Sequence, residues 1–472
     1  MKFVSKTLVA AITIAALSCT AVLVGCSVSL GADGRDGQDV SIYEIYEATN
    51  KARVEEGLEE LTFLEFISEY LNYDSQELAD MASLQASINR SLLSSVQVTA
   101  TFPAMVQSGS LPWQQEEGTV TSQGSGVIVD IDKDEGDMYI VTNCHVVFNN
   151  SSLNNNKYSD DVDVYLYGRE YSTYSSVVNG ELQYYIDDTY AIPAQIIGAS
   201  LNYDIAVLKV DNSDAVKNSS AIAADWSGNE SVPVGETVYA IGNAAGSGIS
   251  ATNGIVCVDR EYITLDMYDT TSNYNDDFTY RTIRTSVPIY SGNSGGGLFN
   301  IDGDLVGIIN SKTTAASSGE YSDNISHALP EANVRRVVQS MIDRYEQTGS
   351  TTYGIYRALL GITVEASSPS ADMNNDTNTV EKIDNAEITD IQSGSLAEGS
   401  LNVGDVITAI KITSSDGTVK EDVEVKRSYN LSEVMLSARS GDCVCITVNR
   451  SGQENPISYT FTISDANLSL VG

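Results

Sequence analysis

The sequence predicts a mostly β protein, with a short helical segment before its largest domain and a smaller β domain after it. Short apolar runs recur from about residue 96 onward, too closely spaced for helices to alternate with them. Two of these runs flank Asp302-Gly303, a pair typical of a tight hairpin turn. Many short strands joined by turns favour antiparallel barrels or a sandwich over alternating β and α units.

Length and charge limit the classes of function. A chain of 472 residues corresponds to roughly three domains. Its apolar fraction of 42% is enough to bury a core. The formal net charge of −38 repels phosphate backbones and anionic lipid headgroups, so we expect no nucleic-acid partner. The sequence has two histidines, His145 and His327, which are the only candidates for a histidine base.

Residues 1–25 are expected to be a signal peptide. Two lysines precede an uncharged run over residues 7–25, which is also just long enough to be a transmembrane helix. The sequence Leu23-Val24-Gly25-Cys26 favours the signal peptide, because it resembles the lipobox of bacterial lipoproteins. The resemblance implies lipidation of Cys26, a membrane anchor and an extracytoplasmic location in the bacterial cell envelope.

Residues 26–40 and 41–95 are expected to be a flexible tether and a helical segment. Gly and Asp alternate over residues 31–39, which is typical of a charged tether, with calcium binding as the alternative. Two serine or threonine residues stand three positions before a glutamate, the spacing of a capping box: Ser41 with Glu44, and Thr62 with Glu65. An apolar helix face is predicted at Phe63, Phe66, Ile67 and Tyr70.

The largest domain is expected over residues 96–347. Strands are predicted at residues 127–130, 140–142, 205–208, 238–241, 255–258 and 305–309, and a closing helix at residues 330–345. Residues 149–190, rich in Asn, Ser, Tyr and Asp, are expected to be a long surface insertion.

Ser294 is the first candidate for chemistry, because it lies in the glycine-rich sequence S-G-N-S-G-G-G-L. A serine hydroxyl needs an adjacent base and donors for the developing oxyanion. Flanking glycines let the backbone turn its N–H groups inward, so Gly292, Asn293 and Ser294 are the candidate oxyanion hole. A glycine-rich loop without chemistry is the alternative for this motif taken alone.

The same residues satisfy G-x-S-x-G, the nucleophile elbow of α/β-hydrolases. That elbow requires a helix after the serine and a histidine downstream of it. Here a strand, turn and second strand are predicted after Leu298, and the better histidine lies upstream. The elbow interpretation is therefore rejected.

His145 and Asp204 complete the candidate site. His145 follows the predicted strand at residues 140–142, and Asp204 directly precedes the strand at residues 205–208. Each residue alone is more often a core histidine or a turn aspartate. Together with Ser294, they occur in the order His, Asp, Ser, which is the chymotrypsin order of the triad.

Three segments in register, V-T-N-C-H-V-V, Y-D-I-A-V-L-K and S-G-N-S-G-G, resemble the HtrA- or Deg-type serine proteases. The resemblance covers about residues 93–470. It implies two chymotrypsin-like β-barrels with a His145, Asp204 and Ser294 triad between them. No cofactor is expected. A homotrimer is suggested by the resemblance alone. The sequence departs from the family in its long His-to-Asp spacing, in Ser286, where many relatives have an acid, and in Gly297.

Residues 353–472, after a polar linker at residues 347–352, resemble a PDZ domain through G-S-L-A-E and V-G-D-V-I. The resemblance implies binding of a peptide C-terminus as an added strand. Its carboxylate would be held by the loop Leu359-Leu360-Gly361-Ile362, and the pocket completed by Val434 or Leu436. The alternatives are a generic small β domain and leucines that only fill its core.

The cysteines and histidines predict neither a second nucleophile nor a metal site. Cys144 adjoins His145, but neighbouring strand residues point to opposite faces, so a cysteine protease is rejected. Cys443 and Cys445 lie at the limit of disulfide geometry, and Cys144 could pair with Cys257 only if the fold joins them. Two isolated histidines supply no zinc spacing, so no metal is expected.

Taken together, the motifs predict a membrane-anchored, extracytoplasmic serine endopeptidase that cleaves unfolded or misfolded polypeptides. The alternative is a PDZ-based peptide-binding chaperone or stress sensor with weak proteolysis.

Overall fold

The computed structural model describes residues 27–29, 39–55, 57–61, 66, 75–107, 115–178, 181–266, 277–314, 321–375 and 377–471. The chain divides into two compact units, Met1–Ala86 and Ser87–Gly472. The expected signal peptide, Cys26 and the second capping box lie outside the described residues. Within the described ranges, no helix combines the length and the hydrophobicity needed to cross a membrane.

The first unit contains a small sheet and a helix. Strands β1 (Ser27–Ser29) and β2 (Asp39–Ser41) pair antiparallel, so the two ends of the expected tether are hydrogen-bonded to each other. Helix α2 (Ile42–Glu55) begins directly after Ser41, where the first capping box predicts a helix start. The ring of Phe66 is buried and lies 5.5 Å from that of Tyr46. Helix α4 (Ser75–Leu92) contains the boundary between the units.

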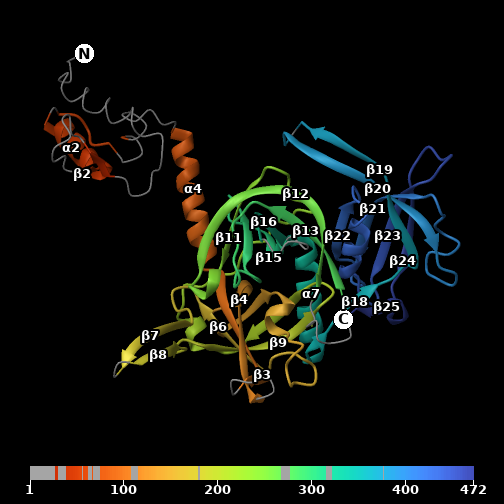
Figure 1. Ribbon diagram of the computed structural model, residues 1–472. Coiled ribbons are helices and arrows are strands. Elements are labelled where there is room, and N and C mark those ends of the chain that lie inside the picture. The colour runs from red at the N-terminus through yellow and green to blue at the C-terminus, as the bar shows by residue number, and fades with distance from the viewer. Residues whose placement is uncertain are drawn as a thin grey trace. The chain divides into compact units, whose positions relative to one another are not determined.

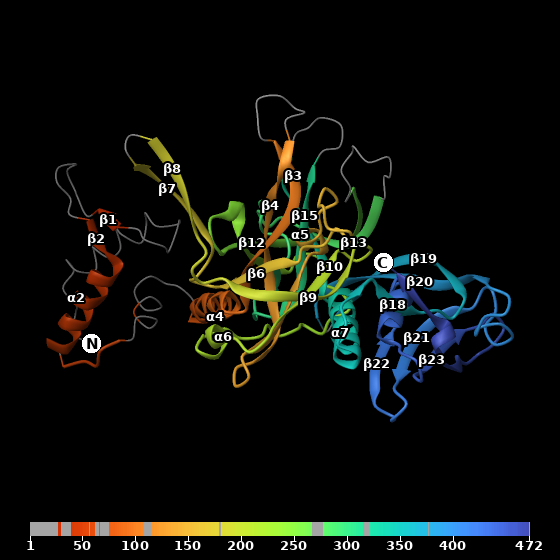
Figure 2. The same cartoon turned by 90° about the horizontal axis from the view of Figure 1, so that it is seen from below.

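The second unit begins with a closed six-stranded barrel (Figure 1). Its strands are β3 (Ser95–Gln107), β4 (Gln115–Asp132), β5 (Asp137–Thr142), β6 (Asp161–Leu166), β9 (Ile192–Ser200) and β10 (Ile205–Val210). They pair in the order β10-β5-β4-β3-β6-β9, and β9 also pairs with β10 to close the ring. Strands β3 and β4 extend beyond the barrel as a long hairpin (Figure 2).

The prediction of one surface insertion over residues 149–190 was wrong. Strand β6 is an integral barrel strand between β3 and β9, and only β7 (Ser172–Val178) and β8 (Glu181–Asp187) form a separate hairpin. Val162 and Val164 are buried, whereas Asp161 is exposed. A strand with one face on the core needs apolar residues only at alternate positions. The polar composition of residues 149–190 as a whole therefore did not reveal strand β6.

A second closed barrel follows, with the strand order β11-β12-β13-β16-β15-β14. Its strands are β11 (Thr237–Gly242), β12 (Ser250–Asp266), β13 (Asp277–Thr285), β14 (Gly297–Asn300), β15 (Leu305–Thr314) and β16 (Tyr321–Pro330). The predicted hairpin joins β14 to β15, with Gly303 in the left-handed region at φ +92°. Helix α7 (Glu331–Thr348) closes the barrel region and ends at Gly349, also left-handed.

The C-terminal domain is a β domain that also contains the short α-helix α8 (Asn430–Val434). Strands β19 (Ile362–Asn374), β20 (Thr379–Ile391), β21 (Val406–Thr413), β23 (Cys443–Asn449) and β24 (Ile457–Thr462) form one sheet in this order, with β22 (Val419–Glu424) beside β21. A second pair contains β18 (Ile355–Ala358) and β25 (Leu468–Val471).

The expected polar linker is partly built into the fold. Strand β17 (Thr352–Tyr353) pairs in parallel with β9 of the first barrel. The ring of Tyr353 stacks on that of Tyr158, with centroids 4.2 Å apart. The connection to the C-terminal domain is therefore attached to the first barrel and is not a free linker.

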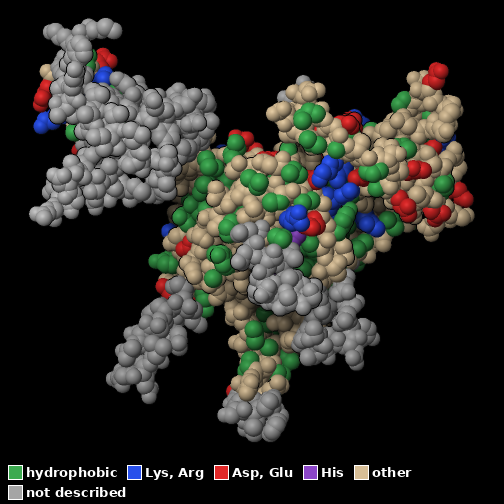
Figure 3. All heavy atoms as spheres, turned by 45° about the horizontal axis from the view of Figure 1, so that its top comes forward, with side chains coloured by type: hydrophobic (Ala, Val, Ile, Leu, Met, Phe, Trp, Pro, Cys, Tyr) green, Lys and Arg blue, Asp and Glu red, His purple; other side chains and the backbone are tan. Residues whose placement is uncertain are grey.

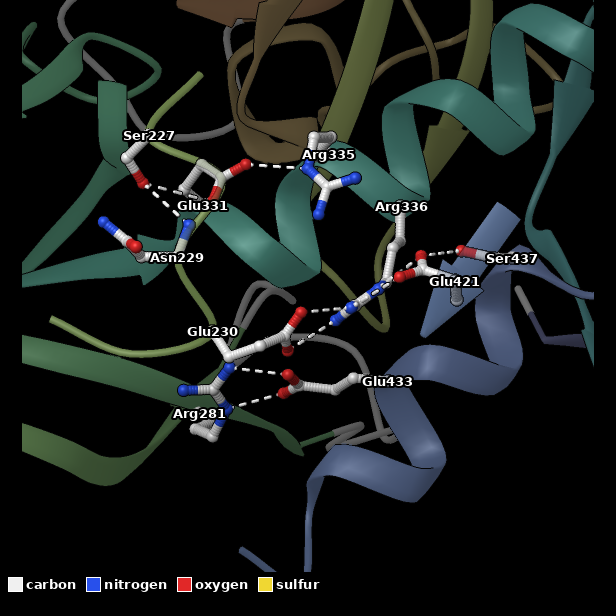
Figure 4. A network of polar contacts seen from close by, with 10 residues as sticks. All are labelled: Ser227, Asn229, Glu230, Arg281, Glu331, Arg335, Arg336, Glu421, Glu433 and Ser437. Carbon is white, nitrogen blue, oxygen red and sulfur yellow. Dashed lines mark hydrogen bonds and ion pairs between the residues drawn. The ribbon is translucent and has the colours of Figure 1, made fainter. Parts of the chain in front are cut away.

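Buried ion pairs attach the C-terminal domain to the second barrel and α7 (Figure 4). Arg336 of α7 binds Glu421 of β22 and also Glu230. Arg281 of β13 binds both carboxylate oxygens of Glu433 on α8, at 2.5 and 2.7 Å. Figure 3 shows Lys and Arg side chains gathered where the barrel meets this domain, although the chain as a whole is strongly acidic.

Candidate active site

His145 and Asp204 form a close pair at one end of the first barrel. Strand β5 ends at Thr142, and His145 lies on the single helical turn α5 (Cys144–Val147) that follows. Its Nδ1 lies 2.8 Å from Oδ2 of Asp204, and its backbone N–H donates to Oδ1 at 2.9 Å. Asp204 is fully buried and adopts φ +48°, so the turn before β10 presents both carboxylate oxygens to His145.

Two asparagines hold Asp204 in place, and sequence reasoning identified neither. Asn143 donates from Nδ2 to the backbone carbonyl of Asp204 at 2.9 Å. Asn310, on β15 of the second barrel, donates from Nδ2 to Oδ2 of Asp204 at 2.5 Å. Asn143 lies in the V-T-N-C-H segment and could have been noticed there. Asn310 lies in an ordinary strand sequence, and only the packing of the two barrels reveals it.

The pKa of His145 is raised above its ordinary value. Burial lowers this pKa, but the negative charge of Asp204 and its hydrogen bond raise it by more. The side chain is still 32% exposed, so a substrate can reach it. His145 is therefore a base that is stabilised when it takes up a proton.

Ser294 comes from the second barrel, in the connection between β13 and β14. Its hydroxyl donates to the backbone carbonyl of Asn310 at 3.1 Å. Among the described residues, no hydrogen bond joins this hydroxyl to the ring of His145. The shared contacts to Asn310 nevertheless place Ser294, His145 and Asp204 in one cluster where the barrels meet.

Two backbone N–H groups beside Ser294 have no protein acceptor in the part of the chain that the structure describes: those of Gly292 and Ser294. Gly292 has φ +98°, a conformation that favours glycine. The N–H of Asn293, in contrast, donates to the carbonyl of Tyr290 at 3.0 Å. The expectation that Asn293 is a third oxyanion donor was therefore wrong, because successive peptide N–H groups in this loop point to different sides.

The rejected alternatives are also inconsistent with the structure. Strand β14 begins at Gly297, so no helix follows Ser294 as a nucleophile elbow would require. The thiol of Cys144 is fully buried, and burial raises its pKa well above the ordinary value. Cys144, Cys257, Cys443 and Cys445 are all free, which answers the open question of a Cys144–Cys257 pair.

The loop before β19 has some of the features expected of a peptide-binding site. Gly361 adopts φ +77°, and a Cβ there would lie 2.2 Å from Cβ of Ser395. Leu359 is exposed and Ile362 is partly buried. Leu360 and Val434 are buried in the core of the domain, and Leu436 is also buried.

Two closed six-stranded barrels with this Ser, His and Asp cluster between them define a serine peptidase of the trypsin-like class. Residues 124–308 match the family described as "Trypsin-like peptidase domain". The chain belongs to the HtrA family of serine proteases: it is 30% identical over 356 residues to "Serine protease Do-like HtrA" of Lactococcus lactis subsp. lactis, covering 74% of this chain and 72% of the relative.

Two further comparisons are more distant. "Probable periplasmic serine endoprotease DegP-like" of Bartonella henselae is 28% identical over 336 residues, covering 71% of this chain and 52% of that protein. The solved structure "HtrA-type protease AlgW with decapeptide" aligns with a TM-score of 0.45 and 22% identity, covering 82% of this chain and 98% of that chain.

Proposed function

We propose that His145, Asp204 and Ser294 are the catalytic triad of an endopeptidase that hydrolyses exposed, unfolded or misfolded polypeptide. The observation that supports this most directly is the His145–Asp204 pair facing a serine from the other barrel. Membership of the HtrA family supplies the reaction class, and the triad assignment is the proposal.

The mechanism follows from the geometry. Ser294 Oγ attacks the scissile carbonyl carbon, while Nε2 of His145 takes the hydroxyl proton. Asp204 orients the ring and stabilises the imidazolium through its 2.8 Å contact. The N–H groups of Gly292 and Ser294 stabilise the oxyanion. His145 then protonates the leaving amine, and water, deprotonated by the same ring, releases the acyl group from Ser294.

The C-terminal domain supplies a surface for capturing substrate in this proposal. Strand β19 is at the edge of its sheet and follows directly on the Leu359–Ile362 loop. An edge strand can pair with an extended peptide, and nearby backbone N–H groups can hold a terminal carboxylate. We infer that the domain binds polypeptide C-termini with apolar ends through Leu359 and Ile362.

An extracytoplasmic, lipid-anchored location is the third part of the proposal. Its support is the Leu23-Val24-Gly25-Cys26 sequence and the similarity to a relative described as periplasmic. Two or more acyl chains hold a protein stably at a membrane, whereas one chain binds marginally.

A peptide-binding chaperone or stress sensor with weak proteolysis is the second candidate function. The observation that favours it is the hydrogen bond from Ser294 to the carbonyl of Asn310, which leaves the Ser294–His145 contact unmade. In the protease interpretation, substrate binding turns the hydroxyl toward His145, since catalytic hydrogen bonds often form only in the complex.

Casein cleavage combined with labelling by a fluorophosphonate decides between the two. The protease interpretation expects casein cleavage and one labelled site, both absent from Ser294→Ala. Ser94→Ala is the control, because it removes a serine hydroxyl that donates only to the carbonyl of Ser91. Casein left intact by the wild-type protein would favour the chaperone, and casein cleaved equally by Ser294→Ala would reject the triad.

A further inference from the structure

The oxyanion hole depends on how the peptide units around Gly292 are turned. In a trans peptide the N–H points opposite to the carbonyl of the same unit. The direction of the Gly292 N–H is therefore set by whatever holds the carbonyl of Ser291. In the same way, whatever holds the carbonyl of Gly292 sets the direction of the Asn293 N–H. Both carbonyls are held by residues outside the triad.

The carbonyl of Ser291 accepts a hydrogen bond from the backbone N–H of Ala245 at 2.7 Å. Ala245 lies in the short turn Ala244–Gly246 after β11, and its φ of +56° is in the left-handed region. A non-glycine residue in this region is strained and persists only when its surroundings require it. This turn makes the Gly292 N–H point away from Ala245.

The carbonyl of Gly292 accepts a hydrogen bond from Oγ of Ser125 at 2.7 Å. Ser125 is on β4 of the first barrel and is 1% exposed. The same Oγ accepts from the N–H of Asn243 at 2.8 Å, and the N–H of Ser125 donates to the carbonyl of Ser294 at 2.8 Å. One small side chain thus connects the first barrel, the turn after β11 and the loop that contains the nucleophile.

The loop and the turn are also tightly packed. A Cβ built on Gly292 would lie 2.2 Å from the carbonyl oxygen of Asn243. A Cβ on Gly295 would lie 2.1 Å from the carbonyl oxygen of Ser125. Because both contacts are to backbone atoms, a side chain has no room toward the turn at Gly292 or toward β4 at Gly295.

We propose that Ser125 and Ala245 are positioning residues for the oxyanion hole, because they hold the two carbonyls on either side of Gly292. The inference rests on the proposed function of Ser294 and extends it. Loss of the Ser125 hydroxyl leaves the Gly292 carbonyl and the Asn243 N–H buried without a partner, which is costly. The Gly292–Asn293 peptide unit then turns to regain partners. Because this unit lies between the units that carry the Gly292 and Ser294 N–H groups, both oxyanion donors move out of alignment.

The first test is Ser125→Ala, with kcat and KM measured on fluorescein-labelled casein. We expect kcat to fall at least about tenfold, but by less than the roughly 10²–10³ lost when an oxyanion donor is itself removed. KM should change little, because the hole acts on the transition state. Ser94→Ala, which removes an equally buried hydroxyl that donates to the carbonyl of Ser91, should leave kcat unchanged.

A second pair of variants probes the other carbonyl. Ala245→Pro removes the N–H that holds Ser291 and also forces this position from φ +56° to about −65°, so the turn releases the Ser291 carbonyl and kcat should fall. Ala244→Pro controls for a proline in this turn, since the N–H of Ala244 holds no backbone carbonyl among the described residues. Melting temperatures of all variants separate this effect from a failure to fold.

The affinity for phenylboronic acid tests the oxyanion hole directly, because the tetrahedral adduct of this compound with Ser294 places an oxygen in the hole. A residue that only stabilises the fold would not change this affinity. Ser125→Ala should bind it more weakly, by the same factor as the loss in kcat. Folded Ser125→Ala with unchanged kcat and boronate affinity overturns the inference. If Ser294→Ala also cleaves casein normally, the proposed function fails instead, so the two failures are distinguishable.

Discussion

The side-chain amide of Asn310 donates to Oδ2 of Asp204 at 2.5 Å, the same oxygen that lies 2.8 Å from Nδ1 of His145. The backbone carbonyl of Asn310 also accepts the hydroxyl of Ser294. One residue of the second barrel therefore contacts both the acid and the nucleophile of the proposed triad. Its amide shares the charge of Asp204 with His145, so it affects both the position and the basicity of the ring.

Asn310→Ala should lower kcat by about 10- to 100-fold, because a hydrogen bond to a charged group contributes about 1.5–3 kcal/mol. It should also move the apparent pKa in kcat/KM upward, since the charge of Asp204 then acts more fully on His145. Asn300→Ala is the control: Asn300 is buried in the same hairpin but accepts from Asp302 and Asp304. Equal pH profiles for Asn310→Ala and the wild type would contradict this role.

Proteolysis should rise with pH as His145 loses its proton. The structure raises the pKa of His145 above its ordinary value of about 6.5, so the midpoint should lie on the alkaline side of 6.5. The midpoint moves to higher pH because a raised pKa keeps the His145 ring protonated, and therefore inactive as a base, to higher pH. Initial rates on casein between pH 5 and 9 measure the midpoint, and one clearly below 6.5 would conflict with the His145–Asp204 pair.

The C-terminal domain should bind a peptide with a free, apolar C-terminus more tightly than the same peptide as an amide. Amidation removes the charge that the N–H groups of the loop before β19 are proposed to hold. A titration on the full chain carrying Ser294→Ala avoids cleavage of the peptide. Leu359→Asp should weaken binding, whereas Met373→Asp, at an exposed position farther along β19, should not. Equal affinity for acid and amide would rule out the carboxylate loop.

The Arg336–Glu421 pair should make the docking of the C-terminal domain sensitive to acid. Burial raises the pKa of Glu421, but the hydrogen bond and charge of Arg336 lower it by more, so the net pKa is depressed. A carboxyl group whose pKa is lower in the folded state stabilises the fold at pH values above its unfolded-state pKa. This contribution is lost as the pH falls through the folded-state pKa. Stability should therefore decline below about pH 4.5.

Glu421→Gln should lower the free energy of unfolding at pH 7 by about 3 kcal/mol, because it leaves a buried guanidinium with one partner fewer. It should also make the loss of stability at low pH smaller than in the wild type. Glu424→Gln is the control on the same strand, since Glu424 is 76% exposed. Urea titrations at several pH values measure both effects, and identical curves for the two variants would show that the pair does not stabilise the docked domain.

Cys26→Ala should leave the protein as an unlipidated precursor that is no longer held at the membrane. Incorporation of radiolabelled palmitate measures this directly, with the neighbouring Cys19→Ala as the control that keeps the label. Wild-type protein without label, or label that persists in Cys26→Ala, would disprove the anchor.

Much of this protein could be predicted from sequence, because its proposed catalytic residues lie in short motifs of neighbouring residues. The order His145, Asp204 and Ser294, each with its flanking motif, defined both the class of peptidase and the cluster that the structure brings together. The Asp302-Gly303 hairpin and the helix after residue 330 followed from local turn chemistry and helical periodicity. These features depend on residues that are near one another in the chain.

The tertiary structure alone decided the features that depend on residues far apart in the chain. Strand β6 is a barrel strand because its alternate valines find a core between β3 and β9. Asn293 is not an oxyanion donor, because Tyr290 takes its N–H. Asn310 and Ser125 reach the site only because the two barrels pack together. A hydrogen bond between distant residues leaves no periodicity or motif in the sequence, so only the packed fold reveals it.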